Sequence, residues 1–72
     1  MTDEQKRKDS FVRHELRFLV RAIDKDITDI SYTVTDVGEE EVTVTWHNGY
    51  KRRINVTGDS FKAIVWDVLR RI

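Results

Sequence analysis

The spacing of the apolar residues changes twice along this chain, and that change constrains the fold more than any other feature. In residues 11–23 the apolar side chains recur at helical spacing, in residues 30–56 they alternate with polar ones, and in residues 61–72 the helical spacing returns. Helical spacing indicates an amphipathic helix, and alternation indicates a half-buried strand. The sequence therefore predicts a helix, a group of strands and a second helix.

The first helix is expected to begin at Thr2, because Thr2 and Gln5 fit a capping box, in which each side chain bonds the other residue's backbone. A start at Asp9 or Ser10 is the alternative, and residues 2–9 would then be frayed. Apolar residues cover an arc of this helix wider than one core contact needs. The arc consists of a core stripe, Val12, Leu16, Leu19, Val20 and Ile23, and a second stripe, Phe11, Phe18 and Ala22.

Two glycine-containing turns, at residues 36–40 and 47–49, divide the alternating segment into three strands. A one-sided core requires an odd number of loop residues, since a shift of one residue moves every side chain to the other face. We therefore expect a three-residue second loop with Gly49 in a left-handed conformation. The expected pairs are Trp46 with Tyr50 and Val42 with Ile54 in the second hairpin, and Val34 with Val42 and Tyr32 with Val44 in the first.

The second helix follows residues 57–60, which are rich in N-capping side chains. Its apolar residues form the cleanest helical stripe of the chain: Phe61, Ile64, Val65, Val68, Leu69 and Ile72. The predicted fold class is α+β, a single two-layer αβββα domain spanning residues 1–72. A three-stranded antiparallel meander is expected to carry both helices on one face, because that packing buries the apolar side of every element.

Several residues outside the expected core form candidate interaction surfaces. The second stripe of the first helix is either the border of the core or an exposed apolar patch. Trp66 lies off the stripe of the second helix and either covers the core edge or anchors an interface, where Trp is enriched. The polar sheet face is either a solvated surface rich in strand-forming Thr or a binding platform. The candidates are Phe11, Phe18, Ala22, Trp66, Thr33, Thr43, Thr45, Lys51 and Arg53.

The charges are unevenly distributed although the formal net charge is +0. Residues 26–49 contain six acidic residues and no Lys or Arg, whereas residues 50–72 contain six basic residues and two acidic ones. Asp36 and Glu39–Glu41 are expected to form a solvated acidic turn. The alternative is that this turn is a negatively charged contact site for a basic partner.

The chain offers little that indicates catalysis. It has no Cys, so it has neither a thiol nucleophile nor a Cys-ligated metal. His14 and His47 are isolated from other ligands at helical or hairpin spacing. We expect no catalytic, cofactor-binding or metal-binding residues. No apolar run approaches the length that spans a bilayer, and no signal peptide is visible, which favours a cytoplasmic location.

The predicted order of elements resembles that of double-stranded-RNA-binding domains. That family's basic cluster would fall on residues 59–63, which supply only Lys62, and its minor-groove loop would fall on the acidic turn around Gly38. Acidic groups oppose binding that is driven by phosphate neutralisation. The resemblance therefore implies the topology and provides no RNA-contacting residue.

These observations favour a small non-enzymatic protein-interaction module of the kind found among bacterial or phage accessory proteins. Its expected partner is an unknown protein or a second copy of the chain, as in a homodimer, and not a membrane. The alternative is a nucleic-acid-binding domain that uses Lys51 and Arg53 of the third strand together with the basic ends of the helices.

Overall fold

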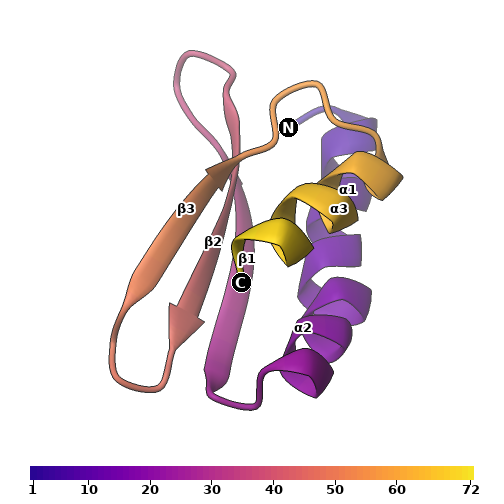
Figure 1. Ribbon diagram of the computed structural model, residues 1–72. Helices are drawn as coiled ribbons and strands as arrows, with labels where there is room; N and C mark the ends of the chain where they lie inside the picture. The colour runs from indigo at the N-terminus through magenta and orange to yellow at the C-terminus, as the bar shows by residue number, and fades with distance from the viewer.

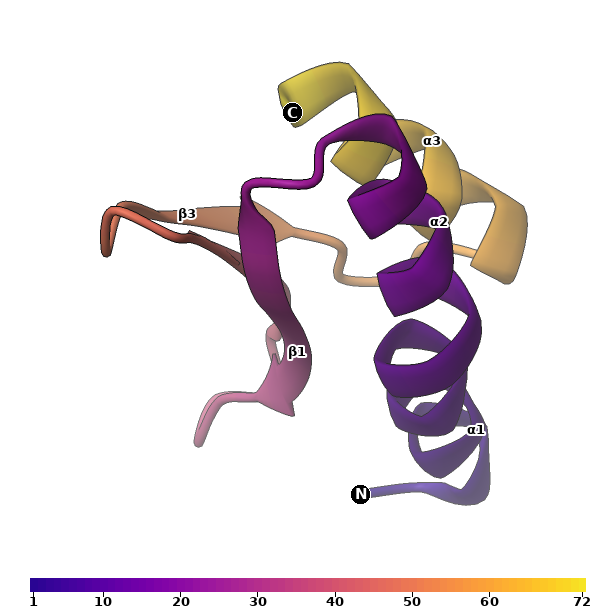
Figure 2. The ribbon, with the colours of Figure 1, turned by 90° about the horizontal axis from the view of Figure 1, so that it is seen from below.

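The computed structural model describes all 72 residues and has the predicted α+β architecture. A long helix is followed by one antiparallel sheet with strand order β1-β2-β3 and by a shorter helix. Figures 1 and 2 show two layers, with the long helix and α3 on the same face of the sheet. The elements are α1 (Asp3–Phe11), η1 (Val12–Leu16), α2 (Arg17–Ile23), β1 (Ile27–Val34), β2 (Glu40–Trp46), β3 (Lys51–Asn55) and α3 (Phe61–Arg71).

The first helix begins where its capping box predicts. The backbone N–H of Gln5 donates to Oγ1 of Thr2 at 3.1 Å, and the backbone N–H of Thr2 donates to Oε1 of Gln5 at 2.9 Å. These reciprocal bonds satisfy two N–H groups that the first turn leaves without a partner. The start at Thr2 is confirmed, and residues 3–9 are helical.

The long helix contains one widened turn, the π-helix η1, in which Arg17 N–H donates to the carbonyl of Val12 five residues back. On an ideal α-helix each step of four residues rotates about 40° beyond a full turn. The wider turn offsets part of that rotation. As a result Lys8, Val12, Leu16 and Val20, each four residues apart, all face the sheet and are buried.

Two residues of the predicted core stripe lie elsewhere. Leu19 is 39% exposed and Ile23 is 59% exposed. The prediction that they belong to the core was wrong, because it assumed uniform 3.6-residue turns through a segment that contains a π-helix.

The second hairpin has the predicted register. Trp46 N–H donates to the carbonyl of Tyr50 at 2.8 Å, and Val42 lies opposite Ile54. Gly49 has φ of +88°, in the left-handed region that a three-residue loop requires. The three-residue loop is therefore confirmed.

The first hairpin has the predicted parity and a different register. Tyr32 pairs with Val42 and Val34 pairs with Glu40, so the predicted pairs of Val34 with Val42 and of Tyr32 with Val44 were wrong. The prediction allowed only apolar residues on the inward face. Glu40 occupies an inward position because it finds polar partners there, and this shortens the loop to residues 35–39.

Strand β1 also begins earlier than its alternation indicated. Ile27 is fully buried and pairs with Trp46, and the register shifts between Ile27 and Asp29. This irregularity leaves Thr28 and Asp29 both exposed. It interrupts the alternation, so the sequence pattern alone placed the start of the strand at Ile30.

Twelve buried apolar residues from the helices, the sheet and the segment after β3 form the core between the two layers. The stripe of α3 packs against this core as predicted, with Ile64 and Val68 fully buried. Ser60 caps α3, since its Oγ accepts a hydrogen bond from Ala63 N–H at 3.2 Å. The core consists of Val12, Leu16, Val20, Ile27, Ile30, Tyr32, Val42, Val44, Ile54, Val56, Ile64 and Val68.

Candidate interaction surfaces

The outer side of the long helix carries a hollow lined by basic residues around an exposed aromatic ring. Phe18 lies in this hollow and is 79% exposed, with Ala22 beside it on the same face. The volume of the hollow is about 470 Å³, and no carboxylate lines it. We call this surface the basic–aromatic face; it consists of His14, Arg17, Phe18, Arg21, Ala22 and Lys25.

Most of the cations of the basic–aromatic face have no partner in the molecule. Arg21 and Lys25 form no ion pair. Nη1 of Arg17 lies 4.0 Å from Oδ1 of Asp29, which is the longest distance that counts as an ion pair. Both members of that pair are largely exposed, and solvent screening makes such a pair weak. The face therefore keeps a net positive charge next to an apolar centre.

The second exposed aromatic is Trp66 on α3, which is 64% exposed. It borders a hollow of about 640 Å³ together with Ser60, Lys62, Ala63 and Val65. Because most of its side chain remains accessible to solvent, Trp66 does not cover the core edge. Arg70, one turn further along α3, pairs with Asp67 at 2.6 Å.

Phe11, the third aromatic candidate, lies between the helices. Its ring contacts that of Phe61 edge to face, with centroids 5.3 Å apart and an interplanar angle of 70°. Such a contact adds about 0.5–1.5 kcal/mol beyond burial of the rings. Phe11 belongs to the border of the core, whereas Phe18 and Ala22 form the exposed part of the second stripe.

The open face of the sheet combines hydroxyls with charges of both signs. Lys51 and Arg53 are exposed on β3, while Thr43 and Thr45 of the central strand are half-buried. Asp29 on β1 and Glu41 on β2 lie on the same face as these two cations and offset part of their charge. The cross-strand rows are Asp29–Thr45–Lys51, Ser31–Thr43–Arg53 and Thr33–Glu41–Asn55.

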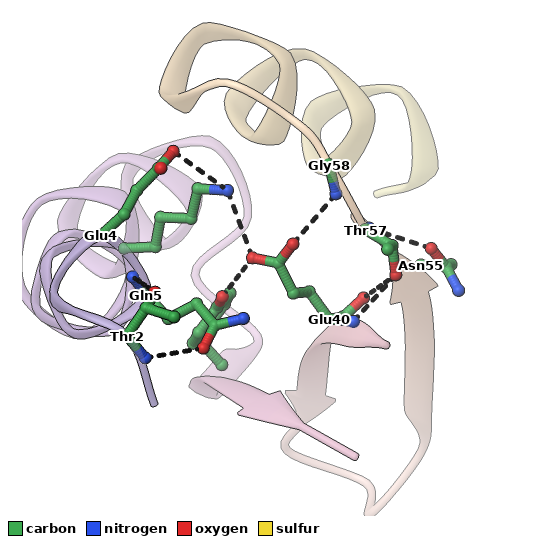
Figure 3. Close-up of polar contacts among 9 residues, drawn as sticks. Thr2, Glu4, Gln5, Glu40, Asn55, Thr57 and Gly58 are labelled. Atoms are coloured by element: carbon green, nitrogen blue, oxygen red, sulfur yellow. Dashed lines mark hydrogen bonds and ion pairs between the residues drawn. The ribbon is translucent and has the colours of Figure 1, made fainter. Parts of the chain in front are cut away.

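A buried polar cluster lies at the end of the core near the helix start. Glu40 is only 6% exposed, and its Oε1 accepts hydrogen bonds from Lys8 Nζ at 3.2 Å and from the hydroxyl of Tyr32. Its Oε2 accepts a hydrogen bond from Gly58 N–H at 2.9 Å. Figure 3 shows the Glu40 carboxylate between the first helix and the Thr57–Gly58 loop.

The expectation of a solvated acidic turn was therefore wrong for Glu40, and both Glu40 and Glu41 belong to β2 rather than to the turn. Extending the alternation of Val42 and Val44 back by one step would have placed Glu40 on the apolar face. Lys8 likewise precedes Val12 and Leu16 by multiples of four residues. The two charges enter the interior because they pair there, which is the condition under which buried charges are tolerated.

The ionisation of Glu40 reflects two opposed effects. Burial acts to raise the pKa of Glu40, and hydrogen bonds from Tyr32, Gly58 and Lys8 act to lower it. The hydrogen bonds outweigh burial, so the pKa of Glu40 lies below its ordinary value. Burial and the neighbouring Glu40 carboxylate raise the pKa of Tyr32. The cluster thus holds an ionised carboxylate and a neutral phenol.

Asp59, just before α3, has the opposite behaviour. Burial, together with a hydrogen bond and charge from Asp67, raises the pKa of Asp59 to about 6. Its Oδ2 is buried and accepts no hydrogen bond.

No group of three or more His, Asp or Glu side chains lies close enough to hold a metal ion. None of the helices combines the length and the apolar character needed to cross a membrane. Comparisons with protein-family models, with curated proteins and with solved structures return no match to this chain.

Proposed function

We propose that this protein is a protein-interaction module and that the basic–aromatic face is its contact surface. The observation that carries the proposal is Phe18, an aromatic side chain that is 79% exposed in a hollow bordered by cations. Burying such a side chain against a partner contributes about 1.5–3 kcal/mol. Arg and aromatic residues are also enriched in the contacts that dominate binding energy.

The fold does not require Phe18. The long helix contributes Val12, Leu16 and Val20 to the core, and Phe18 is not among the residues that pack against it. An exposed aromatic ring remains in contact with water until a partner covers it. The side chain is therefore available for recognition without loss of core packing.

Nucleic-acid binding is the second candidate function, and the exposure of Lys51 and Arg53 on one sheet face favours it. Asp29 and Glu41 lie on the same face and oppose phosphate groups. Fluorescence anisotropy of labelled duplex and single strands at low salt tests this function. Binding that the Lys51→Glu and Arg53→Glu changes abolish would support it, and no binding at low salt would exclude it.

Site-specific photo-crosslinking tests the proposed contact surface. Phe18 is replaced by a benzophenone analogue of phenylalanine, and the protein is irradiated both alone and in cells that express it. Thr33, on the open sheet face, carries the same analogue in a matched control. We expect polypeptide adducts from position 18 and none from position 33. Adducts from position 33 alone would move the contact surface to the sheet, and no adduct from either position would contradict the proposal.

A further inference from the structure

The turn between β1 and β2, residues 35–39, has features that complement the basic–aromatic face. Val37 is 81% exposed, the highest exposed fraction among the large apolar side chains of the molecule. The carboxylates of Asp36 and Glu39 flank it and are also exposed. The turn thus presents an apolar side chain between two negative charges, whereas the face presents an apolar centre between positive charges.

Neither set of charges is satisfied within the molecule. Asp36 and Glu39 form no ion pair, and neither do Arg21 and Lys25. The side chains of Asp36 and Glu39 also make no hydrogen bond. The backbone of the turn is closed by Thr35, whose carbonyl accepts from Gly38 N–H and whose N–H donates to the Glu39 carbonyl. The turn is held in shape while its charged side chains remain free.

The turn cannot reach the face of its own molecule. Strand β1 begins shortly after α2 and leads to the turn through eight residues, a span of roughly 26 Å. The longest dimension of the whole molecule is 31 Å. Figure 1 shows the β1–β2 turn near the start of α1, at the end of the molecule opposite α2. A contact between the two features therefore joins two molecules.

We propose that the basic–aromatic face binds the β1–β2 turn of a second copy of this chain. Val37 packs against Phe18 and Ala22, and the flanking carboxylates of the turn face Arg21 and Lys25. This inference rests on the proposed function and names the partner of the same surface. A second copy is favoured over a foreign acidic peptide because this chain supplies both complementary features, and its net charge of +0 gives no overall repulsion between copies.

The contact joins two different patches, so it is head-to-tail. Each molecule keeps a free turn after its face is filled, and a free face after its turn is bound. Contacts of this kind form rings or open chains rather than isolated two-fold dimers. A single turn in a shallow hollow buries little surface, which is typical of weak and transient association. Salt weakens it further, because the charges are exposed.

Two substitutions separate the two halves of the contact. Phe18→Asp places a negative charge in the face and leaves the turn intact, whereas Val37→Lys places a positive charge on the turn and leaves the face intact. Both side chains are exposed, so we expect circular dichroism melts close to that of the unmodified protein. The mass of each protein is then measured by light scattering over a concentration series, alone and as an equimolar mixture.

The unmodified chain is expected to exceed 8.6 kDa, the mass of one copy, at high concentration and low salt, and to return to that mass at moderate salt. Each variant alone is expected to stay at one copy. The mixture is expected to approach two copies, about 17.2 kDa or twice 8.6 kDa, and not to exceed it. In the mixture the intact turn of Phe18→Asp meets the intact face of Val37→Lys, whereas the two altered halves have lost the apolar contact between Val37 and Phe18.

Three results would overturn the inference. The first is an unmodified chain that stays at one copy at every concentration, and the second is a mixture that does not associate. The third is a Val37→Lys variant that associates alone as the unmodified chain does, since that would indicate a face-to-face contact. Crosslinks from position 18 to a different polypeptide would then retain the proposed function, whereas the absence of crosslinks would remove both.

Discussion

The side chain of Glu40 is hydrogen-bonded to three other parts of the fold. Its carboxylate accepts from Lys8 on α1, Tyr32 on β1 and Gly58 before α3. Its backbone N–H donates to the hydroxyl of Thr57 at 2.8 Å. One acidic residue therefore links the helix start, the sheet and the loop that leads to α3.

Replacing Glu40 with Ala should lower the free energy of unfolding by about 3–5 kcal/mol. Lys8 would remain buried, and its one remaining ion-pair partner would be the exposed carboxylate of Glu4 at 3.7 Å. A domain of this length has a total stability of roughly 4–11 kcal/mol, so the variant can lose its fold. Tyr32→Phe is a milder test and should cost about 1.5–3 kcal/mol, the range for a hydrogen bond to a charged group. Urea denaturation measures both.

The control is Glu41→Ala. Glu41 has the same charge and lies on the open sheet face opposite Thr33 and Asn55. Its removal should change stability by no more than about 0.5 kcal/mol. Equal losses for Glu40→Ala and Glu41→Ala would show that the buried cluster does not hold the elements together.

Asp59 should give the protein a pH dependence between about pH 4 and pH 7. Its pKa is raised to about 6 in the folded state, so the stabilising proton is fully present below the ordinary Asp pKa and is lost as the pH rises through 6. Asp59→Asn should remove this loss, so that the variant gains stability relative to the unmodified protein as pH rises. Thermal melts across this range measure the difference, and parallel curves for the two proteins would contradict it.

Regular periodicity could be recognised in the sequence, whereas local departures from it could not. The stripe of α3 and the register of the β2–β3 hairpin follow from uniform spacing and from Gly49. The π-helix η1 and the irregularity at Thr28 each break the period, so Leu19, Ile23 and the start of β1 were placed incorrectly. These departures depend on contacts between distant segments, which spacing along the chain does not report.

The candidate surfaces were identified only in part. Phe18, Ala22 and Trp66 lie off the core stripes, and this property made them candidates. Helical angles give the direction of a side chain but not how far the core extends in that direction. For that reason the exposure of Phe18, the burial of Phe11 against Phe61 and the unpaired charge of Arg21 required the structure.

Removing the N-terminal cap should destabilise the first turn of α1 locally. Thr2→Ala eliminates the hydroxyl that accepts from Gln5 N–H, and the loss of such a cap costs about 1 kcal/mol. Hydrogen exchange at the Gln5 amide should become about fivefold faster, since 1 kcal/mol corresponds to roughly that factor. Ser10→Ala is the control, because the Ser10 side chain is exposed and makes no hydrogen bond; acceleration at Gln5 in that variant would argue against the cap.

The whole molecule is asymmetric in both packing and charge. Both helices cover one face of the sheet, and the other face remains open (Figure 2). The β1–β2 turn, which carries Asp36 and Glu39, lies at one end, and α2, which carries Arg17 and Arg21, lies at the other (Figure 1). Opposite charges at opposite ends of an elongated molecule favour end-to-end orientation when two copies meet.

The most direct test of the proposed contact is a dilution series followed by amide chemical shifts in two-dimensional NMR. A chain of 72 residues is small enough for every amide to be assigned. We predict concentration-dependent shifts in two groups, residues 14–25 and residues 35–39, with little change on the open sheet face. Shifts confined to the sheet face or to α3, or spectra that do not change with concentration, would contradict association through the basic–aromatic face.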